Sequence, residues 1–237
     1  DVGVSRQDQD LWALRSHQRA LAAQDGNAFD SEIVPLTVME ARQPVVRKFD
    51  EGPRRDCSLE SLSKLKPVFK SHLVAAQDQA NYQASVTAGN ASSLSDGAAA
   101  VLVVDEATML GLKSPWAFRI AGHCSFAGEH QSIFTAPVGA VRKLLSKLKL
   151  TISDVDLFEF NEAFASQTLA CIRQLEIDEE RVNVRGGAIA LGHPLGCSGA
   201  RVLVTLLHLL NDKSLTRGIA TLCLGGGEAV ALMVERV

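Results

Sequence analysis

Three short motifs in the last third of this chain combine groups that can move protons with backbone that a ligand can approach closely. The first reads Asn-Glu-Ala-Phe at residues 161–164, and the second reads Gly-His-Pro at 192–194 inside a glycine-rich stretch. The third is Cys-Leu-Gly-Gly-Gly at 223–227. An amide, an imidazole and a thiol beside glycines suit acyl chemistry on a thioester. The motifs therefore favour an acyl-transfer site.

Each polar residue of these motifs also has a structural interpretation. Cys223 precedes a glycine turn and could exchange a proton with a substrate carbon, but cysteine is often only a small core residue. His193 stands just before an expected helix, where it could donate to an oxyanion or deprotonate a thiol, or could be structural. Asn161 follows an apolar strand and stands where an N-cap is expected, and Glu162 would complement the helix dipole. Single residues leave these alternatives open.

Alternating apolar strands and periodic helices must position the motifs. Expected strands cover 98–104, 118–122, 155–160, 182–184, 219–224 and 229–235, and expected helices cover 138–148, 163–175 and 201–210. This alternation predicts an α/β sheet covered on both faces. The helix at 201–210 is apolar nearly all round, so we expect it to be buried between layers.

The first 90 residues lack the regular alternation of strands and helices that follows them. Ser5 to Asp8 reads as a capping box that opens an amphipathic helix ending near Gly26. A short extended run follows at 33–38, and the chain is then charged and rich in turns to about Lys70. We expect an irregular, mostly helical module here.

Composition excludes several classes of function. The chain has 237 residues, 46% of them hydrophobic and 22% charged, and its net charge of -3 gives no reason to expect nucleic acid. Its longest apolar run, 202–210, is too short to cross a bilayer. The odd number of cysteines, with no paired C-x-x-C spacing, favours free thiols in a reducing compartment and no metal site. The compartment could be a bacterial cytoplasm, a mitochondrial matrix or a peroxisome. The start at Asp1 without Met and without a visible signal peptide suggests a processed or truncated piece.

The three motifs occur in the order and at the separations found in thiolases, and the chain resembles that family over nearly its whole length. Segments 5–22 and 50–70 are similar to the family's coenzyme A-binding loop domain, and 86–92 is similar to its pantetheine-contacting segment. The resemblance implies the layered α-β-α-β-α thiolase fold. It implies a loop domain at 1–90, the last strand and helix of the N-terminal half at 91–116, and the C-terminal half at 117–237.

The resemblance also assigns catalytic roles by position. His193 would activate a nucleophilic cysteine and help to form an oxyanion hole, and Asn161 would hold the water that completes this hole. Cys223 would be the general acid and base at the substrate α-carbon. The backbone amide of Gly225 would contribute to a second oxyanion hole.

Coenzyme A and acyl-CoA enter as substrates, and the resemblance implies no permanently bound cofactor and no metal. The family pattern places Arg54, Ser61 and Leu65 around the nucleotide and Ala88, Ala91 and Ser92 along the pantetheine arm. A guanidinium suits phosphate or adenine, and small residues let a thin chain pass. The alternative interpretation of Arg54 is ordinary surface charge.

Three departures from the family pattern affect these expectations. The N-terminal half with the acylated cysteine is expected to be absent, because Cys57, Cys124, Cys171 and Cys197 do not match its motif. The stretch 71–85 is longer than the usual turn before the pantetheine segment. Phe134 replaces a glycine of the family's Met-Gly-x-Gly-Pro sequence, which would narrow or redirect the acyl pocket.

The leading hypothesis is acyl-CoA acetyltransferase chemistry, either thiolytic cleavage of 3-oxoacyl-CoA or condensation of two acyl-CoA molecules. The nucleophilic cysteine would come from the remaining N-terminal half or a partner chain, so the isolated chain is expected to be inactive and the assembly to be a homo-oligomer. Strand 98–104 would pair with strands supplied elsewhere. The alternatives are a non-catalytic module for CoA binding or assembly, and a synthase of the same superfamily with a different second substrate.

Overall fold

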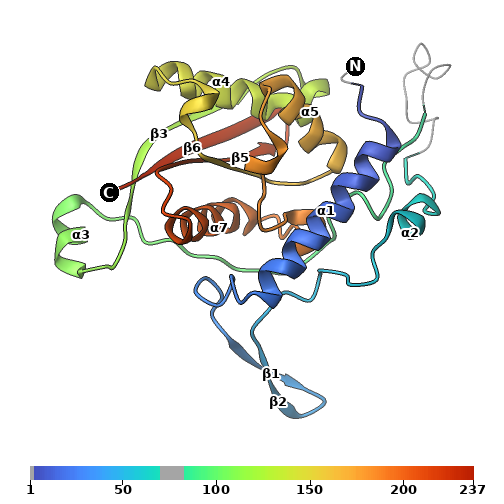
Figure 1. The fold of residues 1–237 in the computed structure, drawn as a ribbon, viewed down its shortest axis with the longest axis horizontal. Helices are drawn as coiled ribbons and strands as arrows, with labels where there is room; N and C mark the ends of the chain where they lie inside the picture. The colour runs from blue at the N-terminus through green and yellow to red at the C-terminus, as the bar shows by residue number, and fades with distance from the viewer. Residues whose placement is uncertain (1–2, 70–82) are drawn as a thin grey trace.

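A mixed four-stranded sheet organises the C-terminal part of the chain. The computed structural model describes residues 3–69 and 83–237 (Figure 1). The strands are β3 (Phe118–Ala127), β4 (Leu157–Phe160), β5 (Arg217–Leu224) and β6 (Glu228–Arg236), in the order β3-β6-β5-β4. β4 and β5 are parallel, and β6 pairs antiparallel with both β5 and β3. The predictions of strands at 118–122, 155–160, 219–224 and 229–235 are confirmed.

Helices cover both faces of this sheet, as predicted (Figure 1). On one side, α4 (Ala136–Leu148) packs on β3 and β6, and α5 (Ala165–Leu175) lies beside it. On the other side, α7 (Ser198–Asp212) packs on β4 and β5. Its Val202, Leu206 and Leu209 are buried, whereas Leu203 and Leu207 on the opposite face are only half-buried. The prediction that this helix is buried on all sides is therefore met on one side only.

Short elements complete the C-terminal part. They are the helix α6 (Ala188–Leu191) and three short 3-10 helices, η3 (His130–Thr135), η4 (Ile152–Asp154) and η5 (Glu179–Arg181). The turn between β5 and β6 is made by the three glycines at 225–227. Gly226 and Gly227 have φ angles of 89° and 90°, a backbone conformation that side chains with a Cβ rarely adopt. The glycine run is therefore a requirement of the turn that follows Cys223.

The long helix α1 (Arg6–Asp25) begins at the predicted capping box, in which the Ser5 and Asp8 side chains each accept from the other's backbone N–H. It packs against α5, α6 and the short helix α2 (Leu59–Ser63). Between α1 and α2 the chain forms a hairpin of β1 (Leu36–Glu40) and β2 (Gln43–Arg47), which projects from the rest of the fold (Figure 1). The extended run expected at 33–38 overlaps β1, but the prediction of a mostly helical module missed β2 and the pairing of the two strands.

Two predicted strands are wrong. Residues 98–104 form no strand, and within the described residues no segment pairs with them; the side chains of Leu102 and Val103 are 77% and 68% exposed. A strand exists only as part of a ladder, so an apolar run without a partner stays irregular. The stretch 182–184 makes a single bridge, from Val182 to Phe158. The helix expected after 98–104 is present as α3 (Glu106–Leu112).

The predicted long stretch at 71–85 lies mostly outside the described residues, because residues 70–82 are not described. In the described ranges 3–69 and 83–237, no helix has the length and apolar character needed to span a membrane.

Candidate active site

Asn161 and His193 come from different elements and meet. Asn161 directly follows β4, and its backbone N–H donates to the carbonyl of Thr221 on β5 at 3.0 Å. His193 follows α6, and its backbone N–H donates to the carbonyl of Ser93 at 3.2 Å. The side chains come together with Asn161 Nδ2 at 3.1 Å from His193 Nε2. The structure thus pairs two of the residues that the motifs predicted.

Ser198 contacts the imidazole nitrogen that faces away from Asn161. Its Oγ lies 2.6 Å from His193 Nδ1 and 3.0 Å from the carbonyl oxygen of Pro194. When the hydroxyl hydrogen is directed at that carbonyl, Oγ accepts from Nδ1–H, because a hydroxyl has one donor and two acceptor sites. In this tautomer Nε2 carries the lone pair and accepts from the amide of Asn161. This is also the tautomer that a general base at Nε2 requires.

Electrostatics also favour a neutral imidazole. Burial lowers the pKa of His193 below its ordinary value, and the positive charge of Arg201 lowers it further. A neutral imidazole can accept a proton at the ring nitrogen that carries its lone pair. Sequence reasoning missed Ser198; a hydroxyl near the start of a helix that follows the glycine-rich stretch was the available signal.

The structure excludes the simple capping interpretation of Asn161 and Glu162. Helix α5 begins at Ala165, and its N-cap is Phe164. Asn161 is therefore not an N-cap, and Glu162 is not in the first turn, so the expected dipole interaction is wrong. Asn161 Oδ1 is buried and accepts no hydrogen bond from the described residues. That oxygen can accept from a water or a substrate.

Cys223 lies on β5, where it pairs with Ala229 of β6. Because Thr221 and Cys223 are two apart on one strand, their side chains point to the same face, and Thr221 is the residue that binds the Asn161 backbone. Burial raises the pKa of the Cys223 thiol, which keeps it protonated and able to donate. In the described residues no hydrogen bond joins Cys223 to Asn161 or His193.

Gly225 follows in the exposed turn after β5. A Cβ at this position would meet nothing within 4 Å. A ligand can therefore reach the Gly225 backbone. The structure places this amide at the end of the strand that carries Cys223, without a hydrogen bond to the Asn161–His193 pair among the described residues.

The segment predicted to contact pantetheine runs between the two halves of the pair. Ala91 forms a bridge with Phe164, and Ser92 donates from its backbone N–H to the carbonyl of Ala163 at 3.0 Å. The following residue is Ser93, whose carbonyl binds the His193 backbone. Ala91 and Ser92 are half-buried and Ala88 is exposed. This predicted segment and the catalytic motifs are therefore brought together.

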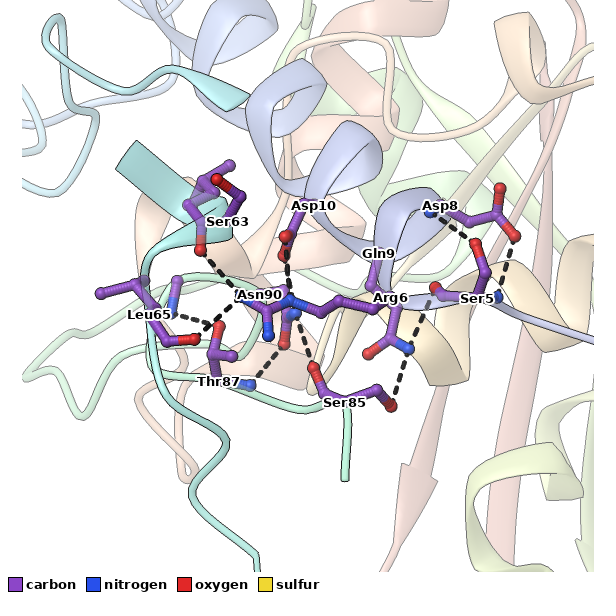
Figure 2. A network of polar contacts seen from close by, with 12 residues as sticks. Ser5, Arg6, Asp8, Gln9, Asp10, Ser63, Leu65, Ser85, Thr87 and Asn90 are labelled. Carbon is purple, nitrogen blue, oxygen red and sulfur yellow. Dashed lines mark hydrogen bonds and ion pairs between the residues drawn. The ribbon is translucent and has the colours of Figure 1, made fainter. Parts of the chain in front are cut away.

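Helix α1 holds the predicted nucleotide-binding segment against the pantetheine segment (Figure 2). Arg6 donates to the carbonyl of Leu65 at 3.0 Å, and Asp10 accepts from Asn90 Nδ2 at 2.9 Å. The Leu65 side chain also lies close to Gly89, where a Cβ would come within 2.5 Å of Leu65 Cδ1. Leu65 and the 86–92 segment therefore form neighbouring parts of one surface.

The other two predicted nucleotide contacts are also exposed residues. Ser61 is the N3 residue of the α2 capping box, where its hydroxyl donates to the carbonyl of Ser58 at 2.8 Å. Arg54 is exposed, and its backbone N–H donates to His17 Nδ1 at 3.2 Å. The Arg54 side chain is therefore accessible, whereas the Ser61 hydroxyl is already engaged within its helix.

Phe134 lies beside the first catalytic motif. Its ring is 5.2 Å from that of Phe164, edge to face at 87°, and 43% of Phe134 is exposed. Phe69 contacts the same Phe164 ring at 6.2 Å. The narrowing of the acyl pocket by Phe134 remains a prediction. Among the described residues, no group of three or more His, Cys, Asp or Glu side chains could hold a metal ion.

Comparison with known proteins identifies relatives across the whole chain. A probable acetyl-CoA acyltransferase of Staphylococcus aureus (strain NCTC 8325 / PS 47) is 47% identical over 235 residues, which is 99% of this chain and 57% of that protein. The crystal structure of the Bacillus anthracis acetyl-CoA acetyltransferase matches 99% of this chain and 57% of that chain, with a TM-score of 0.88 and 41% identity. Human mitochondrial 3-ketoacyl-CoA thiolase gives a TM-score of 0.86, 34% identity and coverage of 99% and 56%.

This chain thus spans a little more than half the length of these relatives. The family model of the thiolase C-terminal domain matches residues 114–236, and that of the thiolase N-terminal domain matches residues 1–107. The expectation that the N-terminal half is absent is therefore wrong, because part of that domain is present; the finer division at residues 90 and 116 stays a prediction. With its layered α/β fold and matches over both domains, the chain belongs to the thiolase family.

Proposed function

We propose that this chain supplies the proton-transfer and oxyanion-binding side of a thiolase active site. The reaction is cleavage of 3-oxoacyl-CoA by coenzyme A or, in reverse, condensation of two acyl-CoA molecules. The observation that carries the proposal is the chain of contacts from Ser198 through His193 to Asn161. The relatives named as acetyl-CoA acyltransferase and 3-ketoacyl-CoA thiolase support the substrate class.

His193 acts first as a base. Nε2 takes the proton of a nucleophilic thiol, the thiolate sulfur attacks the thioester or ketone carbonyl carbon, and the C=O electron pair moves to oxygen. The imidazolium Nε2–H then donates to that oxyanion, together with a water held by Asn161. Collapse of the adduct expels coenzyme A thiolate in condensation, or an acyl-CoA enolate in cleavage. The unpartnered Asn161 Oδ1 is the acceptor that can hold such a water.

Cys223 transfers the proton to and from the substrate α-carbon. In cleavage its thiol gives a proton to the enolate carbon, and the thiolate so formed takes the proton of the incoming coenzyme A, whose sulfur attacks the acyl-enzyme carbonyl. The nucleophilic thiolate leaves from that adduct and regains its proton from His193, which completes the cycle. In condensation the Cys223 thiolate removes the α-carbon proton before the enolate carbon attacks the acyl-enzyme carbonyl. The raised pKa of the buried thiol favours the proton-donating form between turnovers. The backbone N–H of Gly225, in the open turn after β5, donates to the second developing oxyanion.

In this proposal none of the four remaining cysteines is the thiol that accepts the acyl group. Cys124, Cys171 and Cys197 are buried, and burial raises the pKa of Cys171 to about 12. Burial also raises the pKa of the Cys57 thiol. A raised thiol pKa leaves little thiolate, which is the nucleophilic form. We therefore expect a nucleophile from further thiolase sequence or a partner chain, and little turnover from this chain alone.

Coenzyme A would lie across the surface that α1 holds together. Its pantetheine arm would pass the small residues Ala88, Ala91 and Ser92, which lead from the exposed side to His193. Its nucleotide would meet Arg54, Ser61 and Leu65. Of these, the exposed Arg54 guanidinium is the group suited to a phosphate.

A second candidate is a non-catalytic module for coenzyme A binding or assembly. The observation that favours it is the exposed apolar stretch at 101–104, which suits an interface irrespective of chemistry. A synthase with a different second substrate would keep the same site but would fail to cleave 3-oxoacyl-CoA. An assembly module would keep affinity for a partner and show neither reaction.

One comparison of variants decides among these candidates. Thiolysis and acyl-enzyme formation are measured on the complete assembly with native sequence, Cys223→Ser and His193→Ala. Thiolase function requires turnover by the native assembly and its loss in both variants, with acylation retained in Cys223→Ser. Turnover that survives both substitutions contradicts the proposal. A native assembly that binds coenzyme A but forms no acyl-enzyme supports the non-catalytic module.

A further inference from the structure

Glu162 is a fully buried carboxylate that accepts four hydrogen bonds from four different residues. Trp12 Nε1 donates to Oε1 at 3.0 Å and Ser16 Oγ donates to Oε2 at 2.8 Å, both from α1. Asn183 Nδ2 donates to Oε1 at 2.8 Å. The backbone N–H of Ile189 donates to Oε2 at 3.2 Å. Two donors meet each oxygen, so the surroundings match an acceptor-only carboxylate.

One set of contacts in this network fixes the end of β4, directly before Asn161. The Asn183 amide clamps Phe160 on both sides: its Oδ1 accepts from the Phe160 N–H at 2.8 Å, and its Nδ2 donates to the Phe160 carbonyl at 2.9 Å. The same Nδ2 reaches Glu162. The residues on either side of Asn161 are therefore held by one buried amide and one buried carboxylate.

The other set of contacts fixes the approach to His193. Ser16 Oγ, which donates to Glu162, also accepts from the backbone N–H of Gly187 at 3.0 Å. A Cβ at Gly187 would lie 2.3 Å from the Glu162 carboxylate carbon, so the backbone passes directly over this group. Gly187 is the N-cap of α6 and Ile189 lies in its first turn, and the helix ends at Leu191, two residues before His193.

We propose that Glu162 is the positioning residue of the Asn161–His193 pair: a single carboxylate fixes the backbone on both sides of their 3.1 Å contact. It touches neither reacting atom. It acts by setting where the Asn161 amide and the His193 imidazole stand relative to each other. The catalytic meaning of this role rests on the proposed function, whereas the positioning itself is a property of the fold.

Glu159 provides a matched control. It is also fully buried, lies three residues earlier at β4, and differs in its contacts. Neither of its oxygens accepts a hydrogen bond from the described residues, and Arg201 NH1 lies 3.7 Å away. The substitution Glu159→Gln therefore replaces a carboxyl group by an amide at the same depth without breaking a donor network.

The first test reads the imidazole directly in this chain with ¹⁵N-labelled histidine. In Glu162→Gln the side-chain NH₂ faces the donors that reach the Glu162 carboxylate in the native chain, so the network breaks and Asn161 should separate from His193. The ¹⁵N resonance of His193 Nε2 should then lose the signature of a hydrogen-bonded acceptor. In Glu159→Gln this resonance should match the native chain. An unchanged His193 signal in folded Glu162→Gln overturns the proposal.

Two milder variants cover the case in which Glu162→Gln does not fold. Trp12→Phe and Ser16→Ala each remove one side-chain donor and keep the carboxylate. We expect each to shift the His193 signal by less than the full loss, and the double variant to shift it further. Lower stability with an unmoved His193 signal in all three shows a purely structural role and overturns the proposal.

Turnover of the complete assembly separates this inference from the proposed function. Misplacement of about 1 Å can cost on the order of a hundredfold in rate, so kcat should fall by about that factor in Glu162→Gln. The KM of Glu162→Gln for the CoA thioester should stay within about threefold of the native value, because substrate contacts are retained. The turnover rate of the control Glu159→Gln should also stay within about threefold of the native rate. A moved His193 signal in an assembly without thiolase turnover supports positioning and contradicts the proposed function. An unmoved signal with normal turnover contradicts positioning alone.

Discussion

Asn161 and His193 are 32 residues apart in the chain, yet Nδ2 of the first lies 3.1 Å from Nε2 of the second. The two ring nitrogens of His193 have different partners, because Nδ1 lies 2.6 Å from the Ser198 hydroxyl. When Nδ1 carries the proton, the lone pair of Nε2 faces the Asn161 amide, and the proposed function makes this nitrogen the base for the nucleophile. This assignment gives the site a direction of proton transfer and makes its outer residues testable.

Ser198→Ala should weaken the preference for the Nδ1–H tautomer. The hydrogen bond from Nδ1 is lost, and a net contribution of about 1 kcal/mol corresponds to roughly a fivefold slower acylation of the complete assembly. ¹⁵N spectra of His193 and the rapid-quench acylation rate measure the two effects. Ser198→Thr keeps a hydroxyl and is the control. Equal tautomer populations in native and Ala variants would show that Ser198 does not select the base form.

His193→Ala should slow formation of the acyl-enzyme itself in the complete assembly. The imidazole is proposed to activate the nucleophile and to donate to the oxyanion, so its loss should cost about a hundredfold or more. A rapid-quench measurement of the acylation burst tests this. A burst of native rate in the Ala variant means that another group activates the nucleophile.

Cys223→Ser should abolish condensation and thiolysis while coenzyme A binding stays nearly intact. A hydroxyl releases its proton far less readily than a thiol, so the serine cannot cycle between donor and acceptor at the α-carbon. Burial raises the pKa of the Cys223 thiol, and condensation requires the thiolate. The condensation rate should therefore increase only at a pH above the range in which an ordinary cysteine loses its proton. Calorimetric binding and turnover across pH measure both. Full turnover in the serine variant would return Cys223 to the role of a small core residue.

Stability should fall as pH rises because of Glu159. Burial raises the pKa of this carboxyl from 4.5 to about 8, so between these values the folded state keeps a proton that the unfolded state releases. Folding is then penalised progressively toward higher pH. Glu159→Gln cannot ionise and should flatten this decline, leaving the smaller contribution of Glu32, whose pKa burial raises to about 7. Thermal midpoints of the native chain and of Glu159→Gln, measured from acid to mildly alkaline pH, test this difference. If the midpoints of both proteins fall in parallel, Glu159 is not the group that lowers the stability.

Local sequence signals predicted the parts of this fold that depend on neighbouring residues. The capping box at Ser5 and Asp8 and the glycine turn after Cys223 are set by contacts within a few positions. Motif order pointed to Asn161 and His193 before their contact was visible. The capping box and the turn follow from side-chain chemistry and local backbone geometry, whereas the choice of Asn161 and His193 rested on the resemblance to thiolases.

Long-range contacts were not predictable in this way. Glu162 was placed in a helix turn, whereas its partner Trp12 lies 150 positions away in the chain. Ser198 gave only a weak signal, a hydroxyl near the start of a helix, because its role depends on its contact with His193 Nδ1. The β1–β2 hairpin was missed and the strand at 98–104 was wrong, since pairing depends on a partner that periodicity does not reveal.

The apolar stretch at 101–104 should make this chain associate with further polypeptide. Leu102 and Val103 are 77% and 68% exposed. Removing apolar surface from water is worth about 25 cal/mol per Å², so such a run favours a covering partner. We expect the chain to be found with another polypeptide or as part of a larger thiolase, and native mass spectrometry measures this.

Leu102→Glu with Val103→Glu should then reduce association in native mass spectrometry, because two charges would have to be buried in the interface. Met39→Glu on the projecting hairpin is a control of similar exposure, at 68%, and should associate like the native chain if the 101–104 stretch is the contact. Losing association only in the control variant would move the interface to the hairpin. A monodisperse particle of 25.4 kDa that melts cooperatively would contradict the need for a partner, and with it the view that the nucleophile is supplied from outside the chain.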